Sequence, residues 1–370
     1  MRILIFDHLS EGHHGRYVER YASVLSRSHD VVAALPEDLG AELQGKDYDV
    51  DPIPTAEAAP DLGWYRTRTA ELDLLRRAIR RARAQHVLHL YADSLLPLLV
   101  GCRLDARLSV LLFRPRAHYH RLYGDRMTFS DRARGWIYEA ALQAWRHRRD
   151  AHAVLTMDPD AARIWATRGG AKAYFVPEPP IAAPRPTARE PIFDYVLFGF
   201  LDPRKGLAFV ERALTLDSMP NRLRLAIGGP VEPSYRSALA AQIRAMRNTG
   251  VDVELSLRNH SEYETIELLA AARWALLPYV EHYGMSRVLF EAAYAGTPIL
   301  SHDRGLIGKL VRENGLGVTV DCEDPGELRQ TILRLAGRRG VEYQYSDRLR
   351  AFADRHSEDR FAENVSAPYG

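Results

Sequence analysis

Residues 195–207 read YVLFGFLDPRKGL, an apolar run that ends at a glycine and continues through two adjacent cations into a second apolar segment. A continuously apolar run of this length is typical of a strand that is covered on both faces, as strands of parallel sheets are. The glycine predicts a tight turn, and the segment after it is typical of a helix. This stretch therefore predicts one βα unit, the building block of an α/β fold.

Short apolar runs alternate with helical patterns such as Arg16–Leu25 on both sides of this unit. The alternation indicates an α/β protein with two Rossmann-like, doubly wound domains. We expect strands at Arg2–Phe6, Asp30–Ala34, His86–Leu90, Leu108–Phe113, Ala153–Met157, Ala173–Val176, Tyr195–Phe198, Arg224–Ile227, Val251–Leu255, Trp274–Leu277, Pro298–Leu300 and Gly317–Val320.

The prolines between Pro177 and Pro191 are too dense for a helix or a central strand, and they indicate a linker. Open α/β sheets bind ligands at the carboxyl ends of their strands, so we expect the two domains to face each other across a cleft that holds the site. The predicted parts are an N-terminal domain at 1–180, a linker at 181–194, a second domain at 195–345 and a helical tail at 346–370 that packs back across the junction.

The composition is that of an ordinary globular protein, with 370 residues, 46% hydrophobic and 26% charged. A net charge of +2 provides no general field for nucleic acid, which we do not expect as a partner. Cys102 and Cys322 are expected to be buried, reduced thiols, as in a cytoplasmic protein. The apolar run at Ile3 starts without the pattern of a signal peptide, and we expect no integral membrane segment, although peripheral membrane contact remains open.

Two cations follow the predicted strand at Tyr195–Phe198. Arg204 offers a planar fork and Lys205 a compact charge, both beside the start of a predicted helix, where two phosphates would be neutralised. Lysine is rare in this chain and stands only at positions 46, 172, 205 and 309, which singles out Lys205. The alternative is a solvated turn with a charge pair at a helix start.

A second segment, residues 282–298, reads HYGMSRVLFEAAYAGTP. The free amides of Met285, Ser286 and Arg287 would begin a helix whose dipole favours a diphosphate. Glu291 lies among apolar residues of that helix, where a carboxylate needs a partner. A ribose diol would satisfy it, and so would a structural salt bridge or an exposed helix face.

These residues resemble the C-terminal donor-binding domain of the retaining glycosyltransferases of family 4, which have the GT-B fold. The resemblance extends over roughly 195–328 and reaches the first domain only in outline. It rests on Lys205-Gly206 after Gly199, on Gly284, Glu291-Ala292 and Gly296-x-Pro298, and on Gly305, Glu313 and Gly317.

The resemblance assigns roles position by position. Lys205 resembles the lysine that binds the pyrophosphate, and Glu291 the second glutamate of the E-x7-E motif, which binds ribose hydroxyls. The turn from Gly284 to Arg287 would meet the diphosphate and the sugar. Gly228 and Gly229 resemble a glycine turn near the nucleotide, and Arg258 and Asn259 fall where relatives meet the base.

The chain departs from the family pattern at two places. Tyr283 stands where the motif's first glutamate is expected, and Glu281 lies two residues earlier, so that a two-residue insertion would leave Glu281 beside the transferred sugar. We prefer Glu281 to Tyr283 for this role. Phe200 stands where relatives commonly carry an arginine, a charge that Arg204 would supply from the next turn.

In the first domain, Gly12-His13-His14-Gly15 resembles the family's glycine-rich loop after the first strand. The two histidines are expected to be accessible, and His13 is our candidate for contact with the acceptor or the sugar. A metal site is the weaker interpretation, because we see no further ligands at suitable spacing. Further candidates after predicted strands are His89, Asp93, Arg114, Arg116 and His118, with a solvated basic loop as the alternative for the last three.

The resemblance implies a hexosyl transfer from a nucleotide sugar to a small-molecule or glycoconjugate hydroxyl, with retention, without a catalytic metal and without a further cofactor. One alternative is a non-catalytic nucleotide-sugar binding protein, which the displaced glutamate favours. The other is a GT-B sugar-nucleotide epimerase. A dehydrogenase is disfavoured because no G-x-G-x-x-G follows Phe6.

Overall fold

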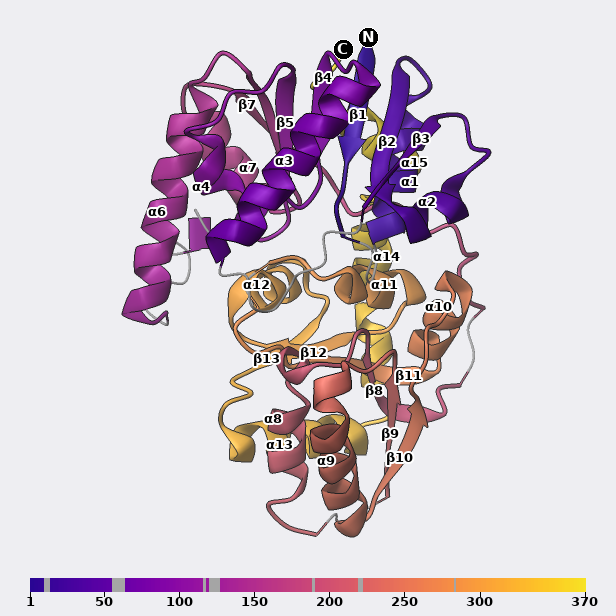
Figure 1. Cartoon of the computed structure of the whole chain (residues 1–370). Coiled ribbons are helices and arrows are strands. Elements are labelled where there is room, and N and C mark those ends of the chain that lie inside the picture. The colour runs from indigo at the N-terminus through magenta and orange to yellow at the C-terminus, as the bar shows by residue number, and fades with distance from the viewer. Residues whose placement is uncertain are drawn as a thin grey trace. The chain divides into compact units, whose positions relative to one another are not determined.

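The computed structural model (Figure 1) describes residues 1–9, 14–54, 64–115, 118–119, 127–187, 190–218, 222–282 and 284–370. The chain divides into two compact units. Unit 1 comprises Met1–Pro179 and Glu358–Gly370, and unit 2 comprises Pro180–Ser357. Within 177–187 and 190–192 the chain forms neither helix nor strand, in keeping with its many prolines.

Unit 1 is built on a parallel sheet of seven strands in the order β3-β2-β1-β4-β5-β6-β7. The order reverses between β1 and β4, so the carboxyl ends of these two neighbours mark the switch point of the sheet. The strands are β1 (Arg2–Phe6), β2 (Asp30–Pro36), β3 (Asp49–Ile53), β4 (His86–His89), β5 (Arg107–Leu112), β6 (Ala151–Thr156) and β7 (Lys172–Phe175).

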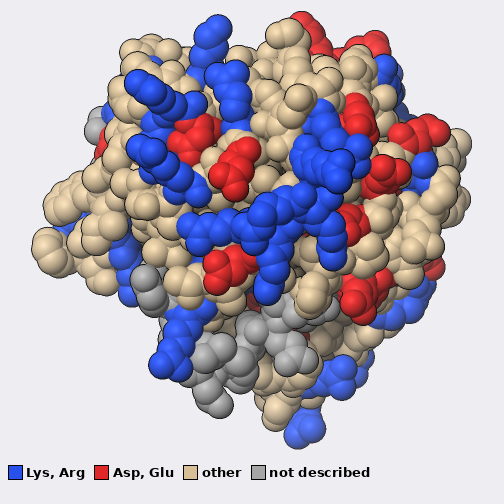
Figure 2. Space-filling model, turned by 45° about the horizontal axis from the view of Figure 1, so that its top comes forward, with Lys and Arg blue, Asp and Glu red and all other residues tan. Residues whose placement is uncertain are grey.

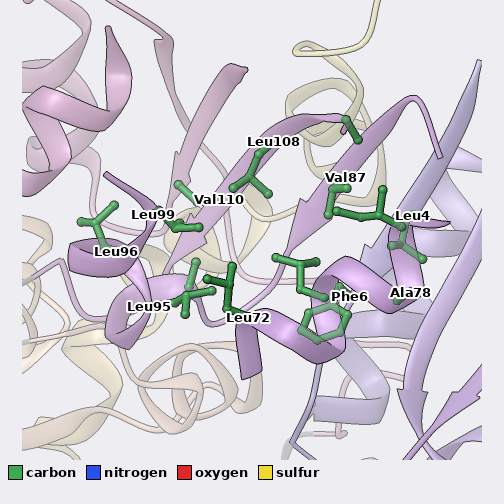
Figure 3. Close-up of a cluster of buried hydrophobic side chains, with 14 of the residues drawn as sticks. Leu4, Phe6, Leu72, Ala78, Val87, Leu95, Leu96, Leu99, Leu108 and Val110 are labelled. Carbon is green, nitrogen blue, oxygen red and sulfur yellow. The ribbon is translucent and has the colours of Figure 1, made fainter. Parts of the chain in front are cut away.

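A continuous apolar core fixes this switch point. Leu4 and Phe6 of β1, Val87 of β4 and Leu72 of α3 are buried in one cluster, which Figure 3 shows. Each such side chain contributes about 1.5–3 kcal/mol when buried. The helices of unit 1 are α1 (His14–Leu25), α2 (Glu37–Leu43), α3 (Trp64–Ala82), α4 (Leu96–Leu99), α6 (Phe129–Arg146), α7 (Pro159–Ala166) and α15 (Glu358–Ser366).

Unit 2 contains a second parallel sheet, of six strands in the order β10-β9-β8-β11-β12-β13. Its strands are β8 (Phe193–Phe198), β9 (Leu223–Gly228), β10 (Val251–Ser256), β11 (Ala272–Leu277), β12 (Ile299–His302) and β13 (Gly317–Val320). Its helices are α8 (Leu207–Leu214), α9 (Arg236–Asn248), α10 (Glu262–Ala270), α11 (Arg287–Ala295), α12 (Gly305–Asn314), α13 (Pro325–Gly337) and α14 (Ser346–Asp354).

The last helices belong to different units. Helix α14 lies in unit 2, whereas α15 lies in unit 1 and contacts α1. Tyr21 of α1 and Phe361 of α15 are fully buried and meet edge to face, with ring centres 5.2 Å apart. The C-terminal residues thus complete the core of unit 1.

All twelve predicted strands are present, but one strand was missed. Strand β3 reads DVDPI and pairs with β2 at the edge of the sheet. Its charges and Pro52 break the apolar pattern, which an edge strand tolerates because one side of it makes no ladder hydrogen bonds. We expected a loop at Gly12–Gly15, but its predicted end is wrong, because α1 already begins at His14.

The structure bears on two further expectations, the burial of the cysteines and the presence of a membrane-spanning helix. Cys322 is buried as expected, whereas Cys102 is only half-buried, and both thiols are free. The described part of the chain contains no helix with the length and apolar character needed to cross a bilayer. On the face in Figure 2, Lys and Arg side chains crowd together with Asp and Glu side chains among them.

A half-buried histidine pair, His86 and His152, predicts acid sensitivity of unit 1. Burial, together with the charges of His152, Arg107, the N-terminal amine and His29, lowers the pKa of His86 to about 4. The rings of His86 and His152 lie 4.8 Å apart, and that of Tyr369 lies 6.2 Å from His86. The unfolded chain therefore takes up this proton near pH 6.5, well before the folded chain does.

We expect the free energy of unfolding to fall as the pH drops from about 6.5 to about 4. Urea titrations at pH 7.5 and pH 5 measure the decrease. In the variant His86→Gln the decrease should be smaller, because one protonation difference is removed. An identical pH dependence in the variant would show that His86 does not contribute.

Candidate functional site

Glycine turns end the neighbouring strands β8 and β9. Gly199 and Gly229 have φ angles of +122° and +121°, which L side chains rarely adopt. A Cβ on Gly229 would lie 2.0 Å from the carbonyl oxygen of Gly199, and the amide of Gly199 donates to the carbonyl of Gly228 at 3.0 Å. Only glycines permit this approach, and they leave bare backbone at the carboxyl ends of the two strands.

The amine of Lys205 lies directly above Gly199. A Cβ on Gly199 would come within 2.5 Å of the lysine Nζ. Nζ donates to the Tyr279 hydroxyl at 2.8 Å and lies 4.4 Å from the centre of that ring. Among the described residues, no carboxylate forms an ion pair with Lys205, so its charge is available to an anion. Tyr279 was not predicted, although it follows β11 at the same edge of the sheet.

Arg204 does not provide a second unpaired cation. Its Nε and Nη2 donate to Oδ2 of Asp202 at 3.0 and 2.5 Å, and Asp202 is buried. The expectation that Arg204 replaces the missing family arginine is therefore not supported by its position. Its carbonyl accepts from the amide of Val280 at 2.9 Å, which connects this turn to the loop after β11.

The start of α11 faces the same loop. Ser286 is the N-cap residue of α11, and its side chain makes no capping hydrogen bond, so the first amides of the helix are not occupied by it. Its buried hydroxyl lies 3.4 Å from that of Tyr279, which in turn accepts from Lys205. The tertiary structure thus brings together the lysine and the helix start that the sequence singled out separately, as an anion site requires.

Glu291 has a protein partner. Its Oε1 accepts from Nε of Arg287 at 3.0 Å, and Arg287 also donates to Glu262 at 2.9 Å. The side chains of Arg287 and Glu291 are each 2% exposed. The salt bridge that we considered as an alternative is thus present, and the guanidinium of Arg287 is buried in it, so that only the backbone of Arg287 remains for a diphosphate. Glu262 was not predicted because it lies on another helix, α10.

Glu291→Gln is therefore expected to lower the free energy of unfolding by about 3 kcal/mol, since it removes a buried carboxylate that pairs with the buried guanidinium of Arg287. Urea unfolding of wild type and variant measures this. Glu313→Gln is the control, because that exposed carboxylate lies 3.8 Å from Lys309 and should contribute little. Unchanged stability with weaker nucleotide binding would instead point to contact with ribose.

Glu281 is placed differently from Glu291. It is exposed, and it makes no hydrogen bond or ion pair within the described part of the chain. Its φ angle of +47° is unusual for a residue with a side chain, and such strain is found preferentially at functional sites. The neighbouring His282 contacts the carbonyl of Met285 at 3.2 Å and thereby closes the turn around buried Gly284. Tyr283 lies outside the described residues.

Arg258 and Asn259 follow β10, the strand next to β9. Both are exposed, and Nη2 of Arg258 donates to Glu264 at 2.6 Å. Glu264 also completes a capping box with Ser261 at the start of α10. The loop is thus held in place, and Asn259 lies on its exposed side.

In unit 1, His13 lies outside the described residues. We expected His14 to be accessible, but it is buried, and its Nδ1 lies 2.7 Å from Oδ2 of Asp7. Its ring centre lies 3.8 Å from that of Tyr91, which stacks on Phe113 at the same distance. Asp7 follows β1, so this contact orders the start of α1 against the switch point.

Two of the weaker candidates in unit 1, Asp93 and His118, serve the fold. Asp93 accepts from the amides of Phe113 and Arg114 at 3.0 and 2.8 Å, and its burial raises its pKa above the usual value. His118 is not in a solvated loop, since it is buried with its ring 6.4 Å from that of Trp165. Arg116 lies outside the described residues.

His89 is buried beside two residues that the sequence did not connect with it. Its Nε2 lies 3.1 Å from Oε1 of Glu71, and Nδ1 of His8 lies 3.4 Å from the same oxygen. Burial lowers the pKa of His8 to about 4. Burial by itself raises the pKa of Glu71, but the hydrogen bond to His89 and the charges of His8 and Arg68 outweigh it and lower that pKa.

A groove with a volume of about 750 Å³ lies elsewhere on unit 2, along α9. Arg236, Arg244, Leu255 and Leu257 are among its lining residues. None of the predicted site residues is among the described residues that line it. We therefore place the candidate site at the carboxyl ends of β8, β9 and β11, where the free charge and the helix start meet.

Residues 193–338 match the family model described as glycosyl transferases group 1. The matched range lies entirely within unit 2, which is thus similar to the domain of this family. Lys205, Tyr279 and the start of α11 all lie within the matched range. No curated protein matches the chain by sequence.

Comparison with solved structures shows the fold of the whole chain. HepE of Anabaena, in complex with UDP and glucose, has a TM-score of 0.72 at 14% identity, with 99% of this chain and 98% of that chain covered. WaaG, a glycosyltransferase involved in lipopolysaccharide biosynthesis, has a TM-score of 0.67 at 17% sequence identity, and both chains are covered fully. Sucrose-phosphate synthase from Thermosynechococcus elongatus has a TM-score of 0.65 at 15% sequence identity, with 100% of this chain and 94% of that chain covered. The two doubly wound units therefore have the GT-B fold, as expected.

Proposed function

We propose that this protein is a glycosyltransferase that moves a sugar from a nucleoside diphosphate sugar to an acceptor hydroxyl with retention of the anomeric configuration. The observation that carries the proposal is the Lys205 ammonium, which Tyr279 holds beside the uncapped start of α11. A diphosphate suits this combination of one fixed cation and free helix amides. The structures of HepE with UDP and with UDP-glucose support a donor of this class.

The proposed reaction breaks the bond between the anomeric carbon and the phosphate oxygen. Negative charge then develops on the leaving diphosphate, where Lys205 and the first amides of α11 stabilise it without reorganisation. The acceptor oxygen attacks from the same face, and its proton passes to the leaving phosphate oxygen. This scheme needs no side chain as general base, no further cofactor and no metal ion at the diphosphate.

Glu281 is our candidate for contact with the transferred sugar. A carboxylate that is exposed and has no partner in the described structure is free to accept hydrogen bonds from sugar hydroxyls. The positive φ angle of Glu281 is a strained backbone conformation. Contact with the sugar would offset part of this strain. Tyr283 is the rival for this role.

Glu281→Gln is expected to reduce kcat at least tenfold while the melting temperature stays within about 1 °C, because the carboxylate makes no internal contact that the change would break. Initial rates with saturating donor measure kcat. Glu254→Gln, also an exposed glutamate of unit 2, is the matched control. Full activity of Glu281→Gln would assign the sugar contact to Tyr283 or another group.

The whole proposal is tested with purified protein and a panel of nucleoside diphosphate sugars. Slow release of nucleoside diphosphate identifies the donor, and proton NMR of the product with an added acceptor shows whether the anomeric configuration is retained. The displaced first glutamate favours a second candidate, a non-catalytic nucleotide-sugar binding protein, which would bind without turnover. Interconversion of the donor's sugar without transfer would indicate an epimerase. The two free thiols support a reducing, cytoplasmic location.

A further inference from the structure

We propose that His8, Glu71 and His89 of unit 1 bind one divalent transition-metal ion, with zinc as the best match. Their three donor atoms lie within 4.8 Å of one another, and all three residues are buried. Two imidazole nitrogens and one carboxylate oxygen form a common zinc ligand set. The proposal is independent of the donor site in unit 2.

The distances between the donor atoms suit tetrahedral coordination. Oε1 of Glu71 lies 3.4 Å from Nδ1 of His8 and 3.1 Å from Nε2 of His89. Ligands bound at zinc–nitrogen and zinc–oxygen distances of about 2.0–2.1 Å are roughly 3.3–3.4 Å apart in a tetrahedron. Glu71 is thus already at ligand spacing from both nitrogens, and the two nitrogens lie within 4.8 Å of each other.

The hydrogen bonds around the cluster leave lone pairs facing inward. Nδ1 of His89 contacts the carbonyl of Leu90 at 2.5 Å, which requires that this nitrogen carry the proton. In the neutral ring, Nε2 then presents a lone pair to Glu71, and a metal-bound histidine has the same arrangement. Nδ1 of His8 is buried and has no hydrogen-bond partner in the described structure. When both rings are neutral and His8 carries its proton on Nε2, these three atoms are all acceptors and repel one another unless a metal ion or a shared proton lies among them.

The remaining contacts orient the ligands. Arg68 donates to Oε2 of Glu71 at 2.6 Å, so that Oε1 is the oxygen that faces the histidines. Hydrogen bonds of this kind to a ligating carboxylate are usual around metal ions. The apolar cluster in Figure 3 fixes Phe6, Leu72 and Val87, which precede or follow the three ligands by one or two residues.

The cluster lies at a place where ligands are expected. His8 follows β1 and His89 ends β4, so both stand at the switch point of the unit 1 sheet. With three protein ligands, the fourth position remains for water or a substrate oxygen. Among the described residues, the other group of this type is His302, Asp303 and Asp321, which differs because it has a single imidazole and both of its carboxylates are only half-buried.

The test uses full-length protein that is stripped with a chelator, loaded with zinc chloride alone and dialysed. Plasma mass spectrometry should find about one equivalent of zinc per chain. Cobalt loading gives a second readout, because tetrahedral Co²⁺ absorbs strongly in the visible range. His8→Gln and His89→Gln should each weaken zinc binding at least a hundredfold, whereas His302→Gln should retain it.

Wild-type protein that holds less than about 0.2 equivalents, or that shows no cobalt spectrum, overturns the proposal and means that a proton bridges the cluster instead. Retention of zinc by His89→Gln overturns it as well. The cobalt spectrum of the wild type remains decisive if a variant fails to fold. Lys205→Ala should keep its zinc, so loss of the donor site and loss of the metal site are distinguishable.

Discussion

Lys205→Ala is expected to reduce kcat/KM for sugar transfer by about 10²–10³-fold. The amine is the unpaired cation above Gly199, and its distance to the Tyr279 hydroxyl is 2.8 Å. Removal of one preorganised group that meets developing charge typically costs this much. Donor binding should weaken too, since the diphosphate is charged in the ground state. Initial rates over a range of donor concentrations separate kcat from KM.

Lys309→Ala is the matched control. Lys309 lies on α12, away from the turn that bears Lys205, and its amine is 3.8 Å from the exposed Glu313. We expect its kinetics to equal those of the wild type. If Lys205→Ala also kept its full kcat/KM, the diphosphate would bind elsewhere, and the proposed function would lose the observation that carries it.

Gly206→Ala should abolish most of the activity and lower the melting temperature of unit 2 by about 6–12 °C. Gly206 has a φ angle of +72°, and a Cβ there would lie 1.8 Å from the carbonyl oxygen of Pro278. The left-handed conformation costs an alanine about 1–2 kcal/mol, and the overlap with backbone adds to this. A total of about 3 kcal/mol corresponds to that shift for a unit of this size. The two loops that hold Lys205 and Tyr279 would be forced apart.

Gly337→Ala serves as the control for the change of residue type. A Cβ at Gly337, at the end of α13, meets nothing within 4 Å. Its melting temperature should stay within about 2 °C of the wild type. Calorimetry of the three proteins gives the comparison. Equal melting temperatures for Gly206→Ala and Gly337→Ala would show that the loop after β11 moves away from the new Cβ without loss of stability.

Much of the fold could be predicted because its signals are local. The run at 195–207 contains a strand, a turn and a helix whose apolar residues, glycine and cations each favour the structure that forms. The edge strand β3 escaped prediction because its pairing with β2, and not its own residues, makes it a strand. Lys205 could be singled out because one lysine after a glycine turn is visible in a chain poor in lysine.

Sequence alone thus determined the two parallel α/β units, the turn that bears Lys205 and the helix that bears Glu291, because backbone conformation and burial follow from neighbours along the chain. Only the tertiary structure decided the partners of the charged groups. Tyr279 meets Lys205 from another strand end, and Arg287 takes the carboxylate of Glu291. Glu71 joins two distant histidines in the same way. Such pairings depend on where parallel strands and helices end in space, and that is not encoded in the spacing of any one segment.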